Sequence, residues 1–243
     1  LQRCRGRAEW PAATVARRGN GRLIAVAVHE SVLKQLRDAA GAGAVDSHGH
    51  TVTPPTEDGV IAAVRVCAAT HTPLRVRSSA AGSGHAPHDG VLLSLERLQS
   101  IDLRAAGITV RAGAGASVDD IRRQADAAKL AIVGLGRGGA GETVGALIGR
   151  GAVPRRSLTG VEAVLTTGET VRFGGGALKD VVGYDVPTLL LGSMGSLAIL
   201  LAATFRLEPA GARTVSGPTP GVVRVDASLR RAFDPEGLLQ SHS

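Results

Sequence analysis

The first half of the chain alternates between helical and strand-like spacing of its apolar residues. From Glu30 to Ala40 they recur every three or four positions, which predicts an amphipathic helix. Thr56 precedes two acidic residues and an apolar stripe, so it is predicted to cap a second helix, which ends before Pro73. The short apolar runs Leu74–Arg77 and Val91–Leu95 then predict two strands.

Strands dominate the second half. Ser117 is predicted to cap one further helix, and Thr167-Gly168 has the composition of a tight turn within a hairpin. The remaining predicted elements are strands over Ile108–Arg111, Val161–Leu165, Thr170–Phe173 and Leu197–Leu207, and a short helix over Tyr184–Leu191. Helices and strands that alternate early, with mainly strands later, predict an α+β fold of two lobes, about residues 29–112 and 113–209.

Charge and composition change the interpretation of the two ends. The formal net charge is +7, but residues 1–22 hold six arginines against one glutamate, and the rest of the chain is nearly neutral. Residues 1–28 are therefore interpreted as a basic, poorly ordered tail. Residues 209–220 are rich in Pro, Gly, Ser and Thr, so 210–228 is interpreted as a linker and 229–243 as a short C-terminal segment.

Composition also argues against several classes of protein. Five aromatic residues are too few for the stacking platforms of a single-stranded nucleic-acid binder, so no nucleic-acid partner is expected. Cys4 and Cys67 match no metal-ligand spacing and indicate neither a metal site nor a disulfide framework. The uncharged stretch 188–205 is interrupted by Gly192 and Gly195, which argues against a membrane span. With no visible signal peptide, a cytoplasmic protein is expected.

Two glycine-containing loops are candidates for binding phosphate. The small residues Ser78–Gly84 directly follow a predicted strand, so their backbone N–H groups could converge on an anion, although a plain surface loop explains them equally well. Gly134–Gly139 formally matches G-x-G-x-x-G. It follows a very short strand and precedes no sustained helix, so a Rossmann unit is not favoured.

A third segment is far more specific. Lys179–Asp185 reads K-D-V-V-G-Y-D, and it is followed by a Gly- and Ser-containing turn and by Thr204–Leu207. This order resembles flavoproteins of the vanillyl-alcohol-oxidase superfamily, with a PCMH-type FAD-binding domain, and in particular the FAD-binding subunits of glycolate oxidase and D-lactate dehydrogenase. Further matching stretches are Pro54–Val60, Gly90–Leu95, Val110–Gly115, Val161–Arg172 and the F-D-P-x-G motif over Phe233–Gly237, so the resemblance runs from about residue 50 to the C-terminus.

The resemblance implies a cofactor, a reaction and a set of binding residues. The cofactor is FAD, and the reaction is oxidation of a small 2-hydroxyacid by hydride transfer to FAD. It identifies no catalytic residue and no metal ligand. The implied FAD-binding residues lie in the pyrophosphate loop, in a second loop and in the last strand with the turn before it: Ser78, Ser79, Ala80, Ala81, Gly82, Ser83, Thr143, Gly145, Ala146, Gly149, Gly195 and Ile199.

Departures from the family pattern leave a second interpretation open. Ser78–Ala81 stand where the family has glycines and a threonine, and Ala146 replaces a glycine. The family's substrate (cap) domain lies between the last strand and F-D-P-x-G, where this chain has only Glu208–Ser228. A partner subunit is therefore expected to complete the active site. The alternative is a degenerate flavin-fold scaffold, or a truncated protein, without FAD or catalytic activity.

Overall fold

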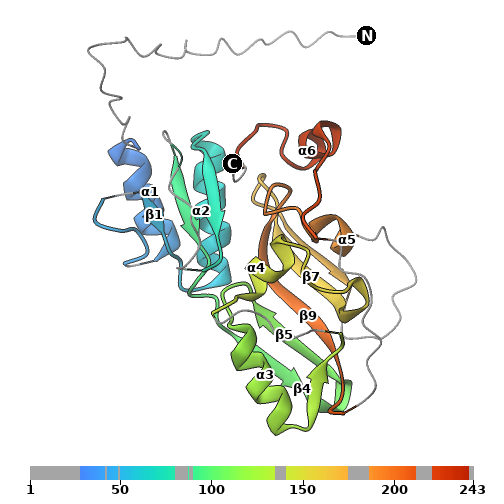
Figure 1. Cartoon of the computed structure of the whole chain (residues 1–243). Helices are drawn as coiled ribbons and strands as arrows, with labels where there is room; N and C mark the ends of the chain where they lie inside the picture. The colour runs from blue at the N-terminus through green and yellow to red at the C-terminus, as the bar shows by residue number, and fades with distance from the viewer. Residues whose placement is uncertain are drawn as a thin grey trace, which may run out of the picture.

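The computed structural model describes residues 28–41, 43–48, 50–79, 87, 90–134, 141–174, 186–211 and 221–240. Within these ranges the chain forms two sheets with helices against them, as the α+β prediction required (Figure 1). The predicted tail, apart from residue 28, lies outside the described residues.

The first lobe is a three-stranded parallel sheet covered by two helices. Its strand order is β1-β3-β2, and β2 pairs with β3 in a register that places Arg77 beside Ser94. Its elements are α1 (Glu30–Ala40), β1 (Thr51–Val52), α2 (Glu57–Ala69), β2 (Leu74–Arg77) and β3 (Val91–Ser94). The bounds of α1 and β2 are those predicted, and the Thr56 side chain caps α2 by accepting a hydrogen bond from the Gly59 N–H.

The second lobe is an antiparallel sheet with the strand order β4-β5-β9-β7-β8, and β6 also pairs with β9. Its strands are β4 (Ile101–Arg104), β5 (Thr109–Gly113), β6 (Leu130–Ile132), β7 (Leu158–Val164), β8 (Thr170–Gly174) and β9 (Ile199–Pro209). Its helices are α3 (Val118–Ala127), α4 (Val144–Gly149) and α5 (Val186–Leu190), with short 3-10 turns at Ala105–Gly107 and Arg155–Ser157. Ser117 caps α3 as predicted.

The expected lobe boundary near residue 112 differs from the observed change of sheet. The first sheet ends at Ser94 and the second begins with β4 at Ile101, so β5 belongs to the second lobe. β4 has two half-buried and two exposed residues, a weak apolar pattern, and it becomes a strand by pairing with β5. That pairing carries no local sequence signal, which is why the boundary was expected later.

Each lobe has a hydrophobic core, and the second sheet contributes to both cores. The first lies between the parallel sheet and its helices, and Val164, Ile199 and Leu201 of the second sheet also reach it. The second lies between the antiparallel sheet and α3, α4 and α5, with Phe205 as its largest fully buried side chain. Because strands of one lobe supply side chains to the core of the other, the lobes are packed as a unit.

The C-terminal residues return to both lobes. After the undescribed residues 212–220, the chain forms α6 (Ala227–Phe233), and Leu239 then makes a parallel bridge to Leu74 of β2. Figure 1 shows this last stretch passing from α6, beside the second sheet, to the first lobe. Of the expected linker, residues 210–211 and 221–228 are described, its last two residues begin α6, and Gly221 and Val223 are hydrogen-bonded to the second lobe.

Candidate FAD site

Three segments meet where the lobes face each other, and we call them the cofactor region. They are Ser78–Ser79 after β2, Thr143–Gly149 including α4, and the turn 192–195 after α5. The Thr143 hydroxyl donates a hydrogen bond to the Ser78 hydroxyl, with 3.2 Å between the two oxygens. The structure therefore brings together two loops that are 65 residues apart in the sequence.

Gly145 lies tightly against Ser78 of the other lobe. A Cβ atom added to Gly145 would lie 2.6 Å from Cβ of Ser78. Two non-bonded carbon atoms cannot come this close, so one of the two segments would have to shift. The serine at position 78 thus fits because its neighbour has no side chain. Ser78 stands where the family has glycine, and here its hydroxyl bonds to the opposite lobe.

The amide groups at the start of α4 are already bonded to protein. The N–H groups of Val144 and Gly145 donate to the carbonyls of Ala116 and Ala114, and the N–H of Ala146 donates to the Thr143 hydroxyl. A diphosphate would have to displace these bonds to use them. In the described arrangement these three N–H groups are therefore not free to bind phosphate.

The turn 192–195 lies against α4 and beside β2, since a Cβ atom at Gly195 would lie 3.9 Å from Cβ of Val76. Its Gly192 and Met194 N–H groups donate to the carbonyls of Ile148 and Gly149. Met194 has φ +52° and Gly195 φ +72°, so a methionine here adopts the left-handed conformation that usually favours glycine. The sequence did not predict a left-handed backbone conformation at Met194, because methionine does not favour one.

The implied FAD-binding residues separate into three groups. Ser78, Ser79, Gly145, Ala146, Gly149 and Gly195 are half-buried, and Thr143 is buried at their contact. Ile199 is fully buried in the first core, so its side chain faces protein. Ala80, Ala81, Gly82 and Ser83 lie outside the described residues, as does the segment Lys179–Asp185.

The residues of the cofactor region fit FAD. Ser78, Ser79, Gly145, Ala146, Gly149 and Gly195 are small, partly accessible and drawn from both lobes, so backbone can approach a dinucleotide closely there, and Ser78 and Ser79 offer hydroxyl groups. Over the described residues, no group of three or more His, Cys, Asp or Glu side chains is placed to hold a metal ion.

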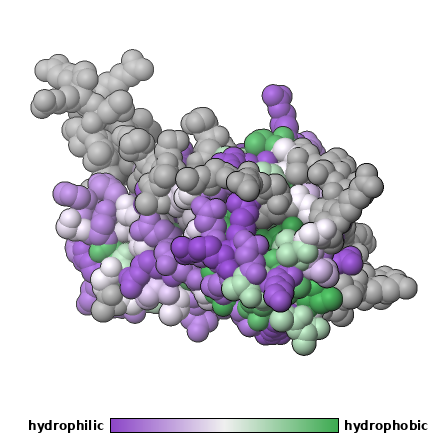
Figure 2. All heavy atoms as spheres, turned by 60° about the horizontal axis from the view of Figure 1, so that its bottom comes forward, coloured by the Kyte–Doolittle hydropathy of each residue, from purple (hydrophilic) through white to green (hydrophobic). Residues whose placement is uncertain are grey.

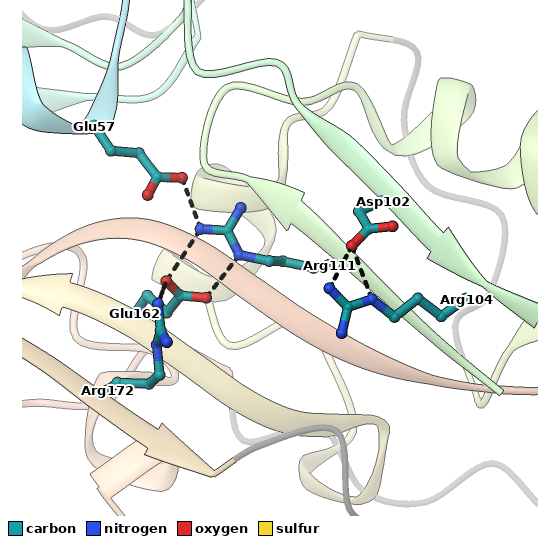
Figure 3. A network of polar contacts seen from close by, with 6 residues as sticks. All are labelled: Glu57, Asp102, Arg104, Arg111, Glu162 and Arg172. Carbon is teal, nitrogen blue, oxygen red and sulfur yellow. Dashed lines mark hydrogen bonds and ion pairs between the residues drawn. The ribbon is translucent and has the colours of Figure 1, made fainter. Parts of the chain in front are cut away.

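A second contact between the lobes is charged. Arg111 of β5 donates to Glu57 at the start of α2 (2.8 Å) and to Glu162 of β7 (2.7 Å), and Arg172 of β8 also donates to Glu162 (2.7 Å; Figure 3). The hydrogen bonds from Arg111 and Arg172 hold the pKa of Glu162 below its usual value, and the bond to Glu162 raises the pKa of Arg111 further above its own. Arg104 pairs separately with Asp102.

The groove beside this network has about 240 Å³ of space and is lined by Arg104, Thr109, Arg111, Gly160, Val161, Glu162, Arg172, Phe173, Gly174 and Thr204. Its three arginines are all paired with carboxylates, so the groove holds nearly compensated charge. Figure 2 shows hydrophilic side chains gathered across the middle of the face that it brings forward. The groove thus combines paired charges with apolar lining from Val161 and Phe173.

Comparison with known proteins identifies the family. The sequence profile of a family described as "FAD binding domain" matches residues 49–174, just over half of the chain. The chain belongs to this family. Its fold is the PCMH-type FAD-binding fold of the vanillyl-alcohol-oxidase superfamily, as the motifs predicted, and FAD is its cofactor.

Two curated relatives and one solved structure agree with this assignment. The glycolate oxidase subunit GlcD of Bacillus subtilis is 29% identical over 172 residues, which covers 65% of this chain and 36% of GlcD. D-lactate dehydrogenase of Archaeoglobus fulgidus is 29% identical over 170 residues, covering 65% of this chain and 38% of that protein. An alkyldihydroxyacetonephosphate synthase superposes with a TM-score of 0.54 at 12% identity, covering 65% of this chain and 31% of the synthase, which supports the fold. The chain spans little more than a third of the curated relatives it matches.

Within the described ranges, no helix is both long and apolar enough to cross a bilayer.

Proposed function

We propose that this FAD-binding domain is part of an oxidoreductase that converts a small 2-hydroxyacid to the 2-oxoacid, with a partner subunit completing the active site. The observation that carries the proposal is the contact of Ser78 with Thr143 and Gly145. This contact joins the two loops that correspond to the FAD-binding loops of the family. The relatives include a glycolate oxidase subunit and a D-lactate dehydrogenase, which supports a hydroxyacid substrate.

Bound FAD would supply the hydride acceptor, taking the hydride from the hydroxyl-bearing carbon while the hydroxyl proton leaves to a base. The chain's own part is to hold and orient the cofactor. Ser78 and Ser79 would provide hydroxyl and backbone donors to hold the diphosphate, and Gly145 and Gly195 would let the backbone approach it. The fixed geometry between the lobes lowers the entropic cost of presenting the flavin to a substrate.

A partner subunit is the proposed source of the substrate clamp and the base. Val222 and Val223 are 66% and 47% exposed, and Val223 rests on the turn at Gly192, within the cofactor region. Leu189 of α5, three residues before Gly192, is also exposed. Exposed branched side chains beside a cofactor site are typical of a surface that a second chain covers.

The first test is the visible absorption spectrum of the purified protein, followed by titration of the colourless form with FAD. The proposal expects a bound flavin spectrum. It also expects that glycolate, D-lactate or D-2-hydroxyglutarate, added without oxygen and with the partner present, bleaches that spectrum. A protein that stays colourless at saturating FAD would instead be the scaffold without cofactor.

A matched pair of variants tests the site itself. Ser79→Asp adds a carboxylate beside the diphosphate, so repulsion is expected to weaken FAD binding by about tenfold or more. Ser31→Asp adds the same charge in the first turn of α1, where it is exposed and favoured by the helix dipole, and should leave FAD binding unchanged. Equal FAD affinity in the two variants would contradict the assignment of the Ser78 loop.

A further inference from the structure

The described C-terminal segment, residues 221–240, contacts both lobes next to the cofactor region. At its start, the N–H of Gly221 donates to the carbonyl of Gly151, and the N–H of Val223 donates to the carbonyl of Gly192. A Cβ atom at Gly151 or at Gly192 would lie 2.1 Å from the Gly221 carbonyl oxygen. The segment therefore lies directly against the turns that follow α4 and α5.

The middle of the segment is bound to the second lobe. The Thr166 hydroxyl donates to the carbonyl of Phe233 at the end of α6 (3.1 Å). Val225, Leu229 and Phe233 pack against the second core. This part of the chain is thus anchored before it crosses to the first lobe.

The end of the segment extends the first sheet. The N–H of Leu74 donates to the carbonyl of Leu238, and the N–H of Gln240 donates to the carbonyl of Leu74, both at 2.8 Å. Leu238 and Leu239 are buried in the first core. The C-terminal residues thereby pair with β2 along the edge that β3 leaves open, and β2 leads without interruption to Ser78.

Asp234 fixes this arrangement. Its carboxylate is buried, with 3% of the residue exposed, and its two oxygens accept the N–H groups of Leu238 and Leu239, each at 2.8 Å. A carboxylate is removed from water at high cost unless such bonds compensate it, and its loss would leave two buried N–H groups without acceptors. The position therefore holds the turn that directs Leu238 and Leu239 into the first core.

We propose that Asp234 is a positioning residue for the cofactor region. By holding Leu238–Gln240 against Leu74, it sets the position of β2 and so of Ser78 relative to α4. The inference rests on the proposed function, because it assumes that the Ser78 loop binds FAD. In this proposal Asp234 links the last residues of the chain to a cofactor loop about 160 positions earlier.

The test compares Asp234→Ala and Asp234→Asn with Glu236→Gln. Glu236 belongs to the same motif, but its side chain is 59% exposed and pairs with His71 on the surface, so Glu236→Gln is a matched control. Two quantities are measured for each: the FAD dissociation constant, and hydrogen exchange of the Leu74 and Gln240 amides in the cofactor-free protein.

Asp234→Ala is expected to speed exchange at Leu74 and Gln240 by at least about tenfold and to weaken FAD binding by a similar factor. Asp234→Asn keeps one acceptor oxygen and should fall between Asp234→Ala and the parent. Exchange within α3, in the second lobe, should not change in any variant. If Asp234→Ala does not fold, Asp234→Asn carries the same comparison with a smaller loss.

Three results would overturn the inference: unchanged exchange at Leu74, equal acceleration of the α3 amides, or the same FAD loss in Glu236→Gln. Failure of the proposed function is distinguishable, because the parent protein would then bind no FAD at all. In that case exchange at Leu74 alone decides whether Asp234 positions β2.

Discussion

The two lobes are joined by two contacts of opposite character. In the cofactor region the contact is neutral and close, with Ser78 against Gly145 and a hydroxyl–hydroxyl bond to Thr143. At the charged groove the contact is made by long side chains, with Arg111 between Glu57 and Glu162. The contact in the cofactor region joins α4 to the residue that follows β2. The charged contact joins β5 and β7 to α2.

The difference shows how each contact can be lost. The neutral contact depends on volume, because one methyl group has no space to enter. The charged contact depends on protonation and is partly open to solvent, since 26% of the Arg111 side chain is exposed. We therefore expect an added methyl group to weaken the neutral contact, and a change of pH or salt concentration to weaken the charged contact.

The largest effect is expected from Gly145→Ala. The new Cβ collides with Cβ of Ser78, and overpacking of this kind costs about 1–3 kcal/mol of unfolding free energy. Denaturant unfolding measures the loss, and FAD titration should show weaker binding. The double variant Ser78→Gly with Gly145→Ala should recover much of the lost stability, whereas FAD binding should stay weakened because the Ser78 hydroxyl is absent.

Gly107→Ala provides the control for that prediction. Its Cβ would meet the nearest atom at an ordinary 3.5 Å, so stability should change little. If Ser78→Gly gave no recovery in the double variant, the close contact would not be the source of the loss.

The charged contact should give the next effect. Arg111→Ala leaves Glu57 without this partner and Glu162 with Arg172 alone, which we expect to cost about 1–2 kcal/mol, less than for a fully buried pair. Unfolding at low and high salt measures it, and the loss should shrink as salt increases. Arg104→Ala removes an exposed pair with Asp102 and should cost below about 0.5 kcal/mol. If Arg111→Ala and Arg104→Ala lowered the unfolding free energy equally, Arg111 would contribute no more than a surface ion pair.

Glu162 should make the charged contact sensitive to acid. The pKa of Glu162 is lower in the folded protein than its ordinary value of 4.5, so the folded state binds its proton more weakly than the unfolded state does. Its contribution is therefore complete above pH 4.5 and is lost as the pH falls below that value. Unfolding of the parent and of Glu162→Gln, followed from pH 7 down to pH 3, should converge at the acid end. Parallel curves over that range would show that the ionised form of Glu162 does not stabilise the fold.

The smallest effect concerns Cys67, which reports on the first lobe alone. Burial raises the pKa of the Cys67 thiol to about 12, so it stays protonated and enclosed near neutral pH. Iodoacetamide followed by peptide mapping should label Cys67 only after unfolding in the parent. In Arg111→Ala, labelling should rise slightly if the lobes separate as folded units, and strongly if the first lobe itself unfolds.

Local features of the chain were predictable because their causes are local. Helix α1 and strand β2 have the predicted bounds, and Thr56 and Ser117 cap the helices that they precede. The turn at Thr167-Gly168 lies between β7 and β8 as expected. The motifs also placed the chain in its family, and the profile match over residues 49–174 confirms that.

What depends on distant residues was decided only in three dimensions. Periodicity, capping and motifs were enough to predict α1, α2, β2 and the family, but not β4. The tertiary structure decided that Ser78 meets Gly145, that Arg111 joins α2 to β7, and that Asp234 secures the chain end beside β2. Capping and periodicity act within a few residues, whereas a contact across 65 positions depends on how whole sheets pack, and no local pattern records that.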